Sequence, residues 1–285
     1  MNLEALLQRP FPMVTESYSK RDVMLYGLGV GAGADPLDKR ELPFVYEADL
    51  RAIPSMTSVL GYPGFWLRDP VLETDWLKLL HGEQYLEFYS LLPPEGEVTG
   101  EFRVLGVTDK GPDKGAIVYF EKLLSNAASG EKICSVRSTY FLRGDGGCGS
   151  YGSSIEAAPA VPDRTPDIVL ELPTLPHQAL IYRLSGDYNP IHADPAAAAE
   201  AGFKAPILHG LCTFGIACRG LINAVCDGMP GRLKSMSVRF SSPVFPGETI
   251  RLEIYQEGDR VCYRAKAVER DLIVLDRGAA KLAAI

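Results

Sequence analysis

Three side chains that could together bind and activate a water molecule lie within six positions of the chain. They are Asp187, Asn189 and His192, near the end of the stretch from Tyr182 to His192. A glycine and a proline interrupt this stretch, which predicts an irregular loop rather than a helix. A carboxylate and an imidazole held by such a turn can grip one water molecule between an acceptor and a donor, as the addition of water to a double bond requires.

A second signal follows at His209 and Gly210, directly before an apolar segment with helical periodicity. A glycine that opens a helix can offer its backbone N–H to a developing oxyanion. His209 has two interpretations, a structural residue at the helix start or a contact to the ligand. Asp187, His192 and His209 could also bind zinc by residue type, but their spacing matches no ligand motif, so we expect no metal.

The composition limits the class of protein. The chain has 285 residues, of which 46% are hydrophobic and 23% charged, with a formal net charge of -7. These values are typical of a globular protein with two domains. No dense basic run supports nucleic-acid binding, and no stretch of about 20 apolar residues could span a membrane.

The termini and cysteines indicate the cellular compartment. The N-terminus lacks the basic and apolar segments of a secretory signal, and the last four residues, Leu282 to Ile285, are not a peroxisomal Ser-Lys-Leu type of address. Six cysteines occur without a Cys-x-x-Cys pair, which is typical of a reducing compartment. We therefore expect a cytoplasmic protein.

The order of elements repeats around a segment rich in glycine, serine, alanine and proline. We expect an N-terminal half over residues 1–150, a linker over 151–162 and a C-terminal half over 163–285. Each half reads as one helix followed by strands, which is an α+β arrangement. The predicted strands are 84–91, 101–108, 115–124 and 131–141 in the first half, and 235–241, 249–256, 260–269 and 272–280 in the second.

The repeat is unequal in its chemistry. Tyr26 aligns with Tyr182, and Gly31 then takes the place of Asp187. Catalysis is therefore expected in the C-terminal half, whereas the N-terminal half should hold substrate. Glycine and proline also interrupt the N-terminal helix signal between Gly61 and Gly64, which predicts a wider binding space in that half.

These residues resemble the type 2, R-specific enoyl-CoA hydratases, within the MaoC-like dehydratase group. The stretch from Tyr182 to His192, with Ala198 after it, is similar to the signature of that group in every defined position. Three N-terminal segments resemble eukaryotic-type members: 22–32, 43–47 and 80–84. Cys148 and Ala193 depart from the family pattern outside the proposed chemistry. The resemblance implies a double hot-dog fold, in which each of two repeats wraps an antiparallel sheet around a central helix.

The resemblance also implies roles for particular residues. Asp187 and His192 correspond to the catalytic pair, Asn189 to an orienting amide and Gly210 to the backbone donor to the thioester oxygen. The positions expected to contact acyl-CoA are His81, Gly82, Lys110, Phe240 and His209. Several of these also have plain structural interpretations, in the core or on the surface.

The expected reaction is reversible hydration of trans-2-enoyl-CoA to (3R)-3-hydroxyacyl-CoA. No cofactor is expected beyond the CoA of the substrate, and we expect a homodimer. Two alternatives stay open: a hot-dog thioesterase or dehydratase that acts on a different acyl-CoA, and a catalytically silent acyl-CoA-binding subunit. Intact Asp187 and His192 argue against a silent subunit, because a silent copy could have lost them.

Overall fold

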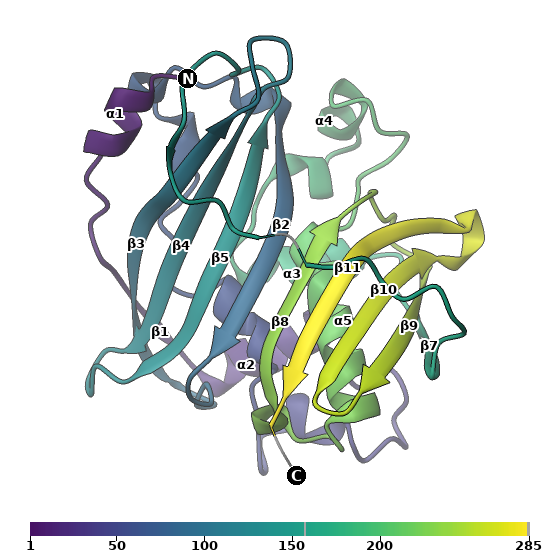
Figure 1. Ribbon diagram of the computed structural model, residues 1–285. Coiled ribbons are helices and arrows are strands. Elements are labelled where there is room, and N and C mark those ends of the chain that lie inside the picture. Colours follow the sequence, from purple (N-terminus) through teal and green to yellow (C-terminus); the bar gives the residue numbers. More distant parts are fainter. Residues whose placement is uncertain (157, 284–285) are drawn as a thin grey trace.

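A single antiparallel sheet runs through the whole molecule (Figure 1). The computed structural model describes residues 1–156 and 158–283. Ala157, in the predicted linker, and the last two residues of the C-terminal tetrapeptide lie outside the described residues. The strands are β1 (Val14–Tyr18), β2 (Leu79–Phe88), β3 (Gly96–Asp109), β4 (Ala116–Asn126), β5 (Lys132–Leu142), β6 (Tyr151–Gly152), β7 (Ile168–Pro173), β8 (Leu233–Phe240), β9 (Thr249–Glu257), β10 (Arg260–Ala267) and β11 (Leu272–Leu282).

The strand order shows that the two halves repeat one plan. The sheet reads β1-β3-β4-β5-β2-β8-β11-β10-β9-β7, and β6 pairs with β3. Each half therefore has the same order outward from the centre, and the halves meet where β2 pairs with β8, from Glu83 opposite Arg239 to Glu87 opposite Ser235. The predicted α+β double hot-dog fold is confirmed. The domain boundaries at 150 and 162 stay predictions, and Tyr151–Gly152 of the expected linker form β6.

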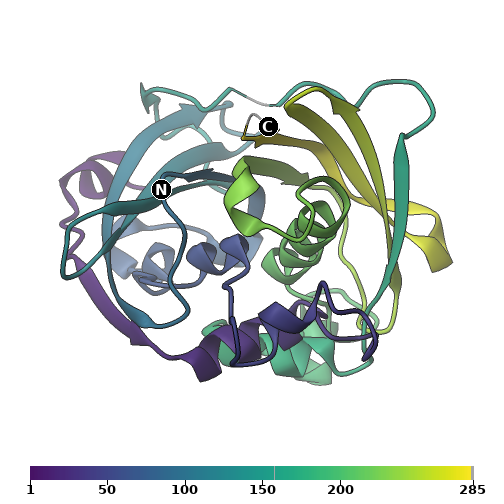
Figure 2. The ribbon, with the colours of Figure 1, turned by 90° about the horizontal axis from the view of Figure 1, so that it is seen from below.

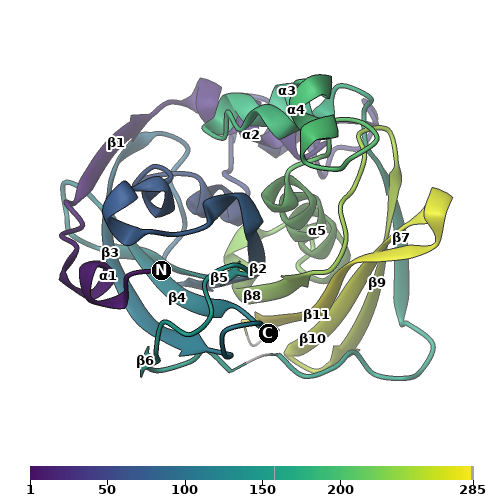
Figure 3. The ribbon, with the colours of Figure 1, turned by 90° about the horizontal axis from the view of Figure 1, so that it is seen from above.

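The helices lie on one face of this sheet (Figures 2 and 3). The α-helices are α1 (Leu3–Gln8), α2 (Lys20–Gly29), α3 (Gln178–Tyr182), α4 (Pro195–Glu200) and α5 (Gly210–Val225). Short 3-10 helices lie in the segments between the α-helices and strands: η1 (Leu42–Phe44), η2 (Pro54–Ser58), η3 (Trp66–Arg68), η4 (Pro70–Leu72), η5 (Trp76–Lys78), η6 (Arg183–Ser185), η7 (Pro190–His192), η8 (Pro230–Arg232) and η9 (Val268–Arg270). No helix in the described ranges is long and apolar enough to cross a membrane.

Helix α5 is the central helix of the C-terminal half. Figure 3 shows it cradled by the curved sheet, with α2, α3 and α4 on its other side. Phe214, Ala217 and Leu221 are fully buried, because a helix that is apolar nearly all round can be covered on every side. The burial of each large apolar side chain contributes about 1.5–3 kcal/mol.

The matching place in the N-terminal half holds only the five residues of η2. Lys122 of β4 lies at its end, where the buried ammonium donates to the carbonyls of Thr57 (2.9 Å), Ser58 (3.1 Å) and Leu60. Burial lowers the pKa of Lys122 to about 8. A cation at a helix C-terminus satisfies carbonyls that have no partner within the helix. The expected central helix is thus shortened in this half, and the interruption from Gly61 onward was its signal.

Helices α2 and α3 join the halves on the side away from the sheet. The Gln178 side chain donates to the carbonyls of Leu28 (2.9 Å) and Gly29 (2.6 Å), at the end of α2. The rings of Tyr26 and Tyr182, which the repeat aligns, lie with their centroids 5.9 Å apart. The loop that follows Tyr182, which holds Asp187 and His192, therefore starts from a junction between both halves.

Candidate active site

The loop after α3 holds Asp187 in a network of local hydrogen bonds. Gly186 has a φ of 120°, which favours glycine. The Asn189 N–H donates to Asp187 Oδ1 (3.1 Å), and Asn189 Oδ1 accepts from the Ile191 N–H (3.3 Å). Side chains of this type cap short turns. The predicted irregular loop is confirmed, with the 3-10 turns η6 and η7 inside it.

His192 has a defined tautomer. Its Nδ1 lies 2.8 Å from the Ile207 carbonyl oxygen. Because a carbonyl only accepts, Nδ1 carries the proton and Nε2 keeps a lone pair when the ring is neutral. The side chain is buried, and burial lowers the pKa of His192 below its ordinary value of 6.5. The neutral imidazole can therefore accept a proton at Nε2.

His209 packs directly on His192. The ring centroids are 3.6 Å apart and the planes make an angle of 25°. His209 Nε2 donates to the backbone carbonyl of Asp187 (3.1 Å), and His209 is only 1% exposed. Burial, reinforced by the charge of His192 when it is protonated, lowers the pKa of His209 to about 4. His209 thus lies in the site as a neutral, buried ring.

The N–H of Gly210 is available to a ligand. Gly210 is the first residue of α5 and is exposed. Its N–H has no hydrogen-bond acceptor among the described residues. The first amides of a helix have no partner within it and carry part of the positive end of the helix dipole. This amide follows the histidine that stacks on His192, so the Gly210 N–H and the side chains of Asp187 and His192 share one corner of the fold.

The N-terminal half contributes His81 to the same corner. The His81 ring lies 4.8 Å from Phe240 and 5.4 Å from Tyr140, between centroids. Phe240 in turn lies 3.3 Å from the position that a Cβ on Gly210 would take. Burial lowers the pKa of His81 to about 4, and the negative charge of Asp187 opposes that shift. His81, Phe240 and Gly210 are therefore brought together from both halves.

Gly82 explains how His81 faces inward. The pairing of β2 with β5 shifts between His81 and Glu83, so that Gly82 is an extra residue. A Cβ at Gly82 would lie 2.8 Å from Thr139 Oγ1, which only glycine avoids. Such a bulge re-aims side chains. It also explains why the predicted strand 84–91 was wrong at its start, because the bulge breaks the alternation on which that prediction rested.

Lys110 lies apart from these groups. It follows β3, is exposed, and its Nζ lies 5.5 Å from the centroid of the Phe141 ring. Successive strand residues point to opposite faces, so Phe141 faces away from its neighbour Tyr140 and from His81. The predicted contact of Lys110 with acyl-CoA stays a prediction, at the rim of the sheet.

One group of possible metal ligands lies in the described residues. Ligand atoms of Asp187, His192 and His209 are all within 4.8 Å of one another. However, one nitrogen of each ring is engaged with a carbonyl oxygen. The two stacked rings also lie in planes only 25° apart, whereas the ligands of a tetrahedral zinc site converge on one point from different directions. The donor set therefore fits a metal poorly.

Three residues lie at the site although the sequence analysis assigned them no role in it. Ile207 offers only its carbonyl, and a backbone group leaves no signal in the sequence. Tyr182 is fully buried and lies 4.9 Å from His209, between ring centroids. Tyr62 is 44% exposed as a whole, but desolvation of its hydroxyl, Tyr140 and the charge of Asp187 raise its pKa. Tyr62 lies in the glycine- and proline-rich interruption noted above, which was its only signal.

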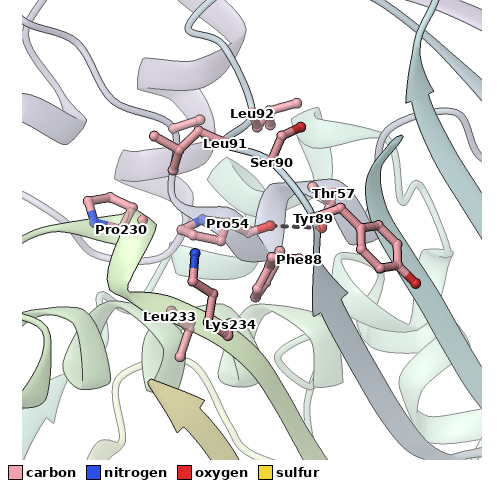
Figure 4. Close-up of a pocket in the computed structure, with 12 residues that line it drawn as sticks. Pro54, Thr57, Phe88, Tyr89, Ser90, Leu91, Leu92, Pro230, Leu233 and Lys234 are labelled. Carbon is pink, nitrogen blue, oxygen red and sulfur yellow. Dashed lines mark hydrogen bonds between the residues drawn. The ribbon is translucent and has the colours of Figure 1, made fainter. Parts of the chain in front are cut away.

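A pocket at the opposite ends of β2 and β8 carries none of this chemistry. Figure 4 shows Lys234 extending into it, beside Pro54 and Phe88. Phe88 is seven positions along β2 from His81, roughly 23 Å at the rise of an extended strand. This pocket is therefore separate from the group around Asp187.

Comparison with known proteins identifies the family. Residues 157–277 match the MaoC like domain, and residues 17–144 match the MFE-2 hydratase 2 N-terminal domain. The peroxisomal enoyl-CoA hydratase 2 of Arabidopsis thaliana is 43% identical, over 96% of this chain and 93% of that protein. This chain belongs to the MaoC-like enoyl-CoA hydratase 2 family.

Other members of the hydratase 2 family cover the chain equally well. A 3-hydroxyacyl-thioester dehydratase Y of Mycobacterium tuberculosis is 38% identical, over 96% of this chain and 95% of its own length. The mouse peroxisomal multifunctional enzyme type 2 is 39% identical over 93% of this chain, which spans 36% of that enzyme. The crystal structure of a MaoC-like dehydratase from Phytophthora capsici covers all of both chains, with 36% identity and a TM-score of 0.88.

Proposed function

We propose that this protein is a hydro-lyase that adds water reversibly to trans-2-enoyl-CoA and forms (3R)-3-hydroxyacyl-CoA. One observation carries the proposal. Half-buried Asp187 and buried His192 lie beside the Gly210 N–H, which has no hydrogen-bond partner among the described residues. His209 contacts both members of this pair and directly precedes that glycine. The membership of the hydratase 2 family supports the same reaction.

The chemistry follows from these groups. The sequence predicts one acceptor and one donor for the water, but the Nδ1 proton of His192 is engaged by the Ile207 carbonyl. Asp187 and the free Nε2 of His192 would therefore each accept a hydrogen bond from one water molecule, which leaves a lone pair of its oxygen for attack on Cβ. The water gives one proton to this pair, its oxygen bonds to Cβ, and the electrons of the double bond move onto the thioester oxygen. The Gly210 N–H stabilises that enolate by about 3 kcal/mol. The same pair then returns the proton to Cα, so all atoms of water enter the product.

The first test is direct. Purified protein with trans-2-decenoyl-CoA should remove the absorbance of the enoyl thioester and yield the (R)-3-hydroxy product on chiral analysis. Release of free CoA would indicate a thioesterase, and an (S) product would contradict the proposed stereochemistry.

Because water is the only co-reactant in this scheme, we propose that no metal or other cofactor is needed, and protein dialysed against EDTA should keep its rate.

A pair of variants isolates the Gly210 N–H. His209 has a ψ of 137°, which suits a residue before proline, and proline is tolerated at the first position of a helix. Gly210→Pro removes the N–H and should lower kcat by about 10²–10³-fold. Gly210→Ala keeps the N–H and places the same Cβ near Phe240. Equal loss in both variants would show that crowding against Phe240, and not the missing donor, is responsible.

The pH profile should follow His192. The ring must be neutral to accept a proton, and burial lowers its pKa below 6.5. Activity is therefore retained below pH 6.5 and is lost only as the pH falls through the lowered value. The acid limb of kcat/KM is the measurement, and an apparent pKa above 6.5 would contradict this assignment.

The assembly and location are proposals of the same kind. We propose a homodimer, which light scattering would detect as twice the 31.0 kDa chain. We also keep the cytoplasm as the proposed location, although the Arabidopsis and mouse relatives are named peroxisomal. Imaging of the labelled full chain would decide between the two compartments.

A further inference from the structure

We propose that His209 is a positioning residue that holds Asp187, His192 and Gly210 in register, and that it does not contact the substrate. This inference rests on the proposed hydration. It assigns His209 a role other than the ligand contact that the sequence predicts. Its basis is the set of contacts that this one side chain makes.

The first contact holds the backbone of Asp187. His209 Nε2 lies 3.1 Å from the backbone oxygen of Asp187. Because that oxygen only accepts, Nε2 carries the proton of the neutral ring. Asp187 lies in a loop after a glycine, so this bond from a buried ring ties the loop to the start of α5.

The second contact fixes the imidazole. His209 covers one face of His192 at 3.6 Å. The centroid of the His209 ring also lies 4.9 Å from the centroid of the Tyr182 ring. His209 thus fills the space between the helix junction and the catalytic ring, and it keeps water from that face of His192.

The third link is covalent. His209 is the N-cap residue of α5, and its carbonyl accepts from the Thr213 N–H at 3.1 Å. A displacement of the ring would therefore also displace the following amide, that of Gly210. A misplacement of about 1 Å in such a group can cost 10²-fold in rate.

Burial, the charge of a protonated His192 and the charge of Arg183 lower the pKa of His209 and so favour its neutral form. The negative charge of Asp187 opposes this shift at His209 and at His192. The Tyr182 ring of α3 lies near His209. The negative charge of Asp187 also acts on His81 of β2, where it raises the pKa of the imidazole against the effect of burial. A second positive charge stacked on His192 at 3.6 Å would oppose protonation of His192 during turnover. The buried neutral ring avoids this conflict.

Two variants separate the contacts. His209→Phe keeps a ring against His192 but loses the donor to Asp187, whereas His209→Gln loses the stacked ring. We expect kcat to fall by about 10- to 100-fold in both, with KM unchanged. In His209→Gln the acid limb should also move up toward pH 6.5, because water reaches His192, while in His209→Phe it should stay in place. His177→Gln, at an exposed histidine, is the control.

The outcomes distinguish the alternatives. A raised KM with unchanged kcat would indicate a direct contact with substrate and overturn the proposal. A lower melting temperature with an unmoved pH profile in His209→Gln would reduce His209 to a structural residue and overturn it too. If wild-type protein does not hydrate the thioester, the proposed function fails first, and the variants then say nothing of catalysis.

A measurement on the wild-type protein does not depend on folding of the variants or on activity. The ¹⁵N shifts of the imidazoles should identify His209 as the Nε2–H tautomer and His192 as the Nδ1–H tautomer. His209 should stay neutral until the pH approaches about 4. The opposite tautomer of His209, or titration near pH 6.5, would remove the hydrogen bond on which the proposal rests.

Discussion

Replacement of Asp187 by Asn is expected to lower kcat for enoyl-CoA hydration by about 10²–10⁴-fold, the range that general acid–base groups contribute. The amide is nearly the same size and can still accept from the Asn189 N–H, which Asp187 Oδ1 does at 3.1 Å. The loop should therefore keep its conformation. What is lost is the negative charge that attracts a proton from water.

His192→Gln should cause a loss of similar size, since it removes the lone pair at Nε2. If the two residues act on one water molecule, the double variant should be little worse than either single variant, because groups that act as a unit are not additive. Independent, additive losses would indicate that Asp187 and His192 serve different steps.

A matched control lies a few residues along the chain. Asp194 is exposed, and its Oδ1 accepts from the Ala196 N–H (2.8 Å) at the start of α4. Asp194→Asn makes the same chemical change, and asparagine caps helices as well as aspartate does. We expect wild-type turnover in this variant. Near-normal turnover in Asp187→Asn would remove Asp187 from the catalytic pair.

The sequence predicted this part of the site because its signals are local. Asp187, Asn189 and His192 lie in one loop, and the turn residues that shape it are adjacent. The central helix α5 was equally clear, since a wide apolar face repeats at helical spacing over Gly210–Val225. The strands of each half were predicted from alternating apolar and polar residues and from the repeated order of elements in the two halves.

Contacts between distant segments could not be predicted in this way. The carbonyl of Ile207 holds His192 over 15 positions, and His209 reaches the Asp187 backbone over 22. A sequence gives no sign of which backbone oxygen will face a ring. For the same reason His209 was expected to contact ligand, whereas its Nε2 is engaged by the protein.

The unequal chemistry of the two halves has a physical counterpart at Gly31. The repeat aligns this residue with Asp187. A Cβ at Gly31 would lie 3.4 Å from a guanidinium nitrogen of Arg219. The guanidinium also donates to the Val30 carbonyl (3.1 Å) and pairs with Glu41. The place that corresponds to Asp187, the proposed catalytic carboxylate, thus lies against a buried ion pair, which joins α5 to the N-terminal half.

Removal of one partner of the Arg219–Glu41 pair should destabilise the protein far more than the same change in an exposed ion pair. The side chains of Arg219 and Glu41 are 5% and 6% exposed. Glu41 also accepts from Asn223 Nδ2 (2.9 Å) and from the Gly33 N–H (2.9 Å). Glu41→Gln leaves a buried cation without its counter-ion and should lower the free energy of unfolding by about 3–5 kcal/mol, as measured by urea denaturation.

Two further variants decide whether burial is the cause. The exposed pair of Arg251 and Glu171, with side chains 40% and 55% exposed, should lose less than about 1 kcal/mol in Glu171→Gln. The double variant Glu41→Gln with Arg219→Met removes the stranded charge, so it should be more stable than Glu41→Gln alone. If Glu41→Gln costs no more than Glu171→Gln, the pair does not hold the halves together. The absence of a carboxylate at Gly31 would then need another explanation than the presence of Arg219 beside it.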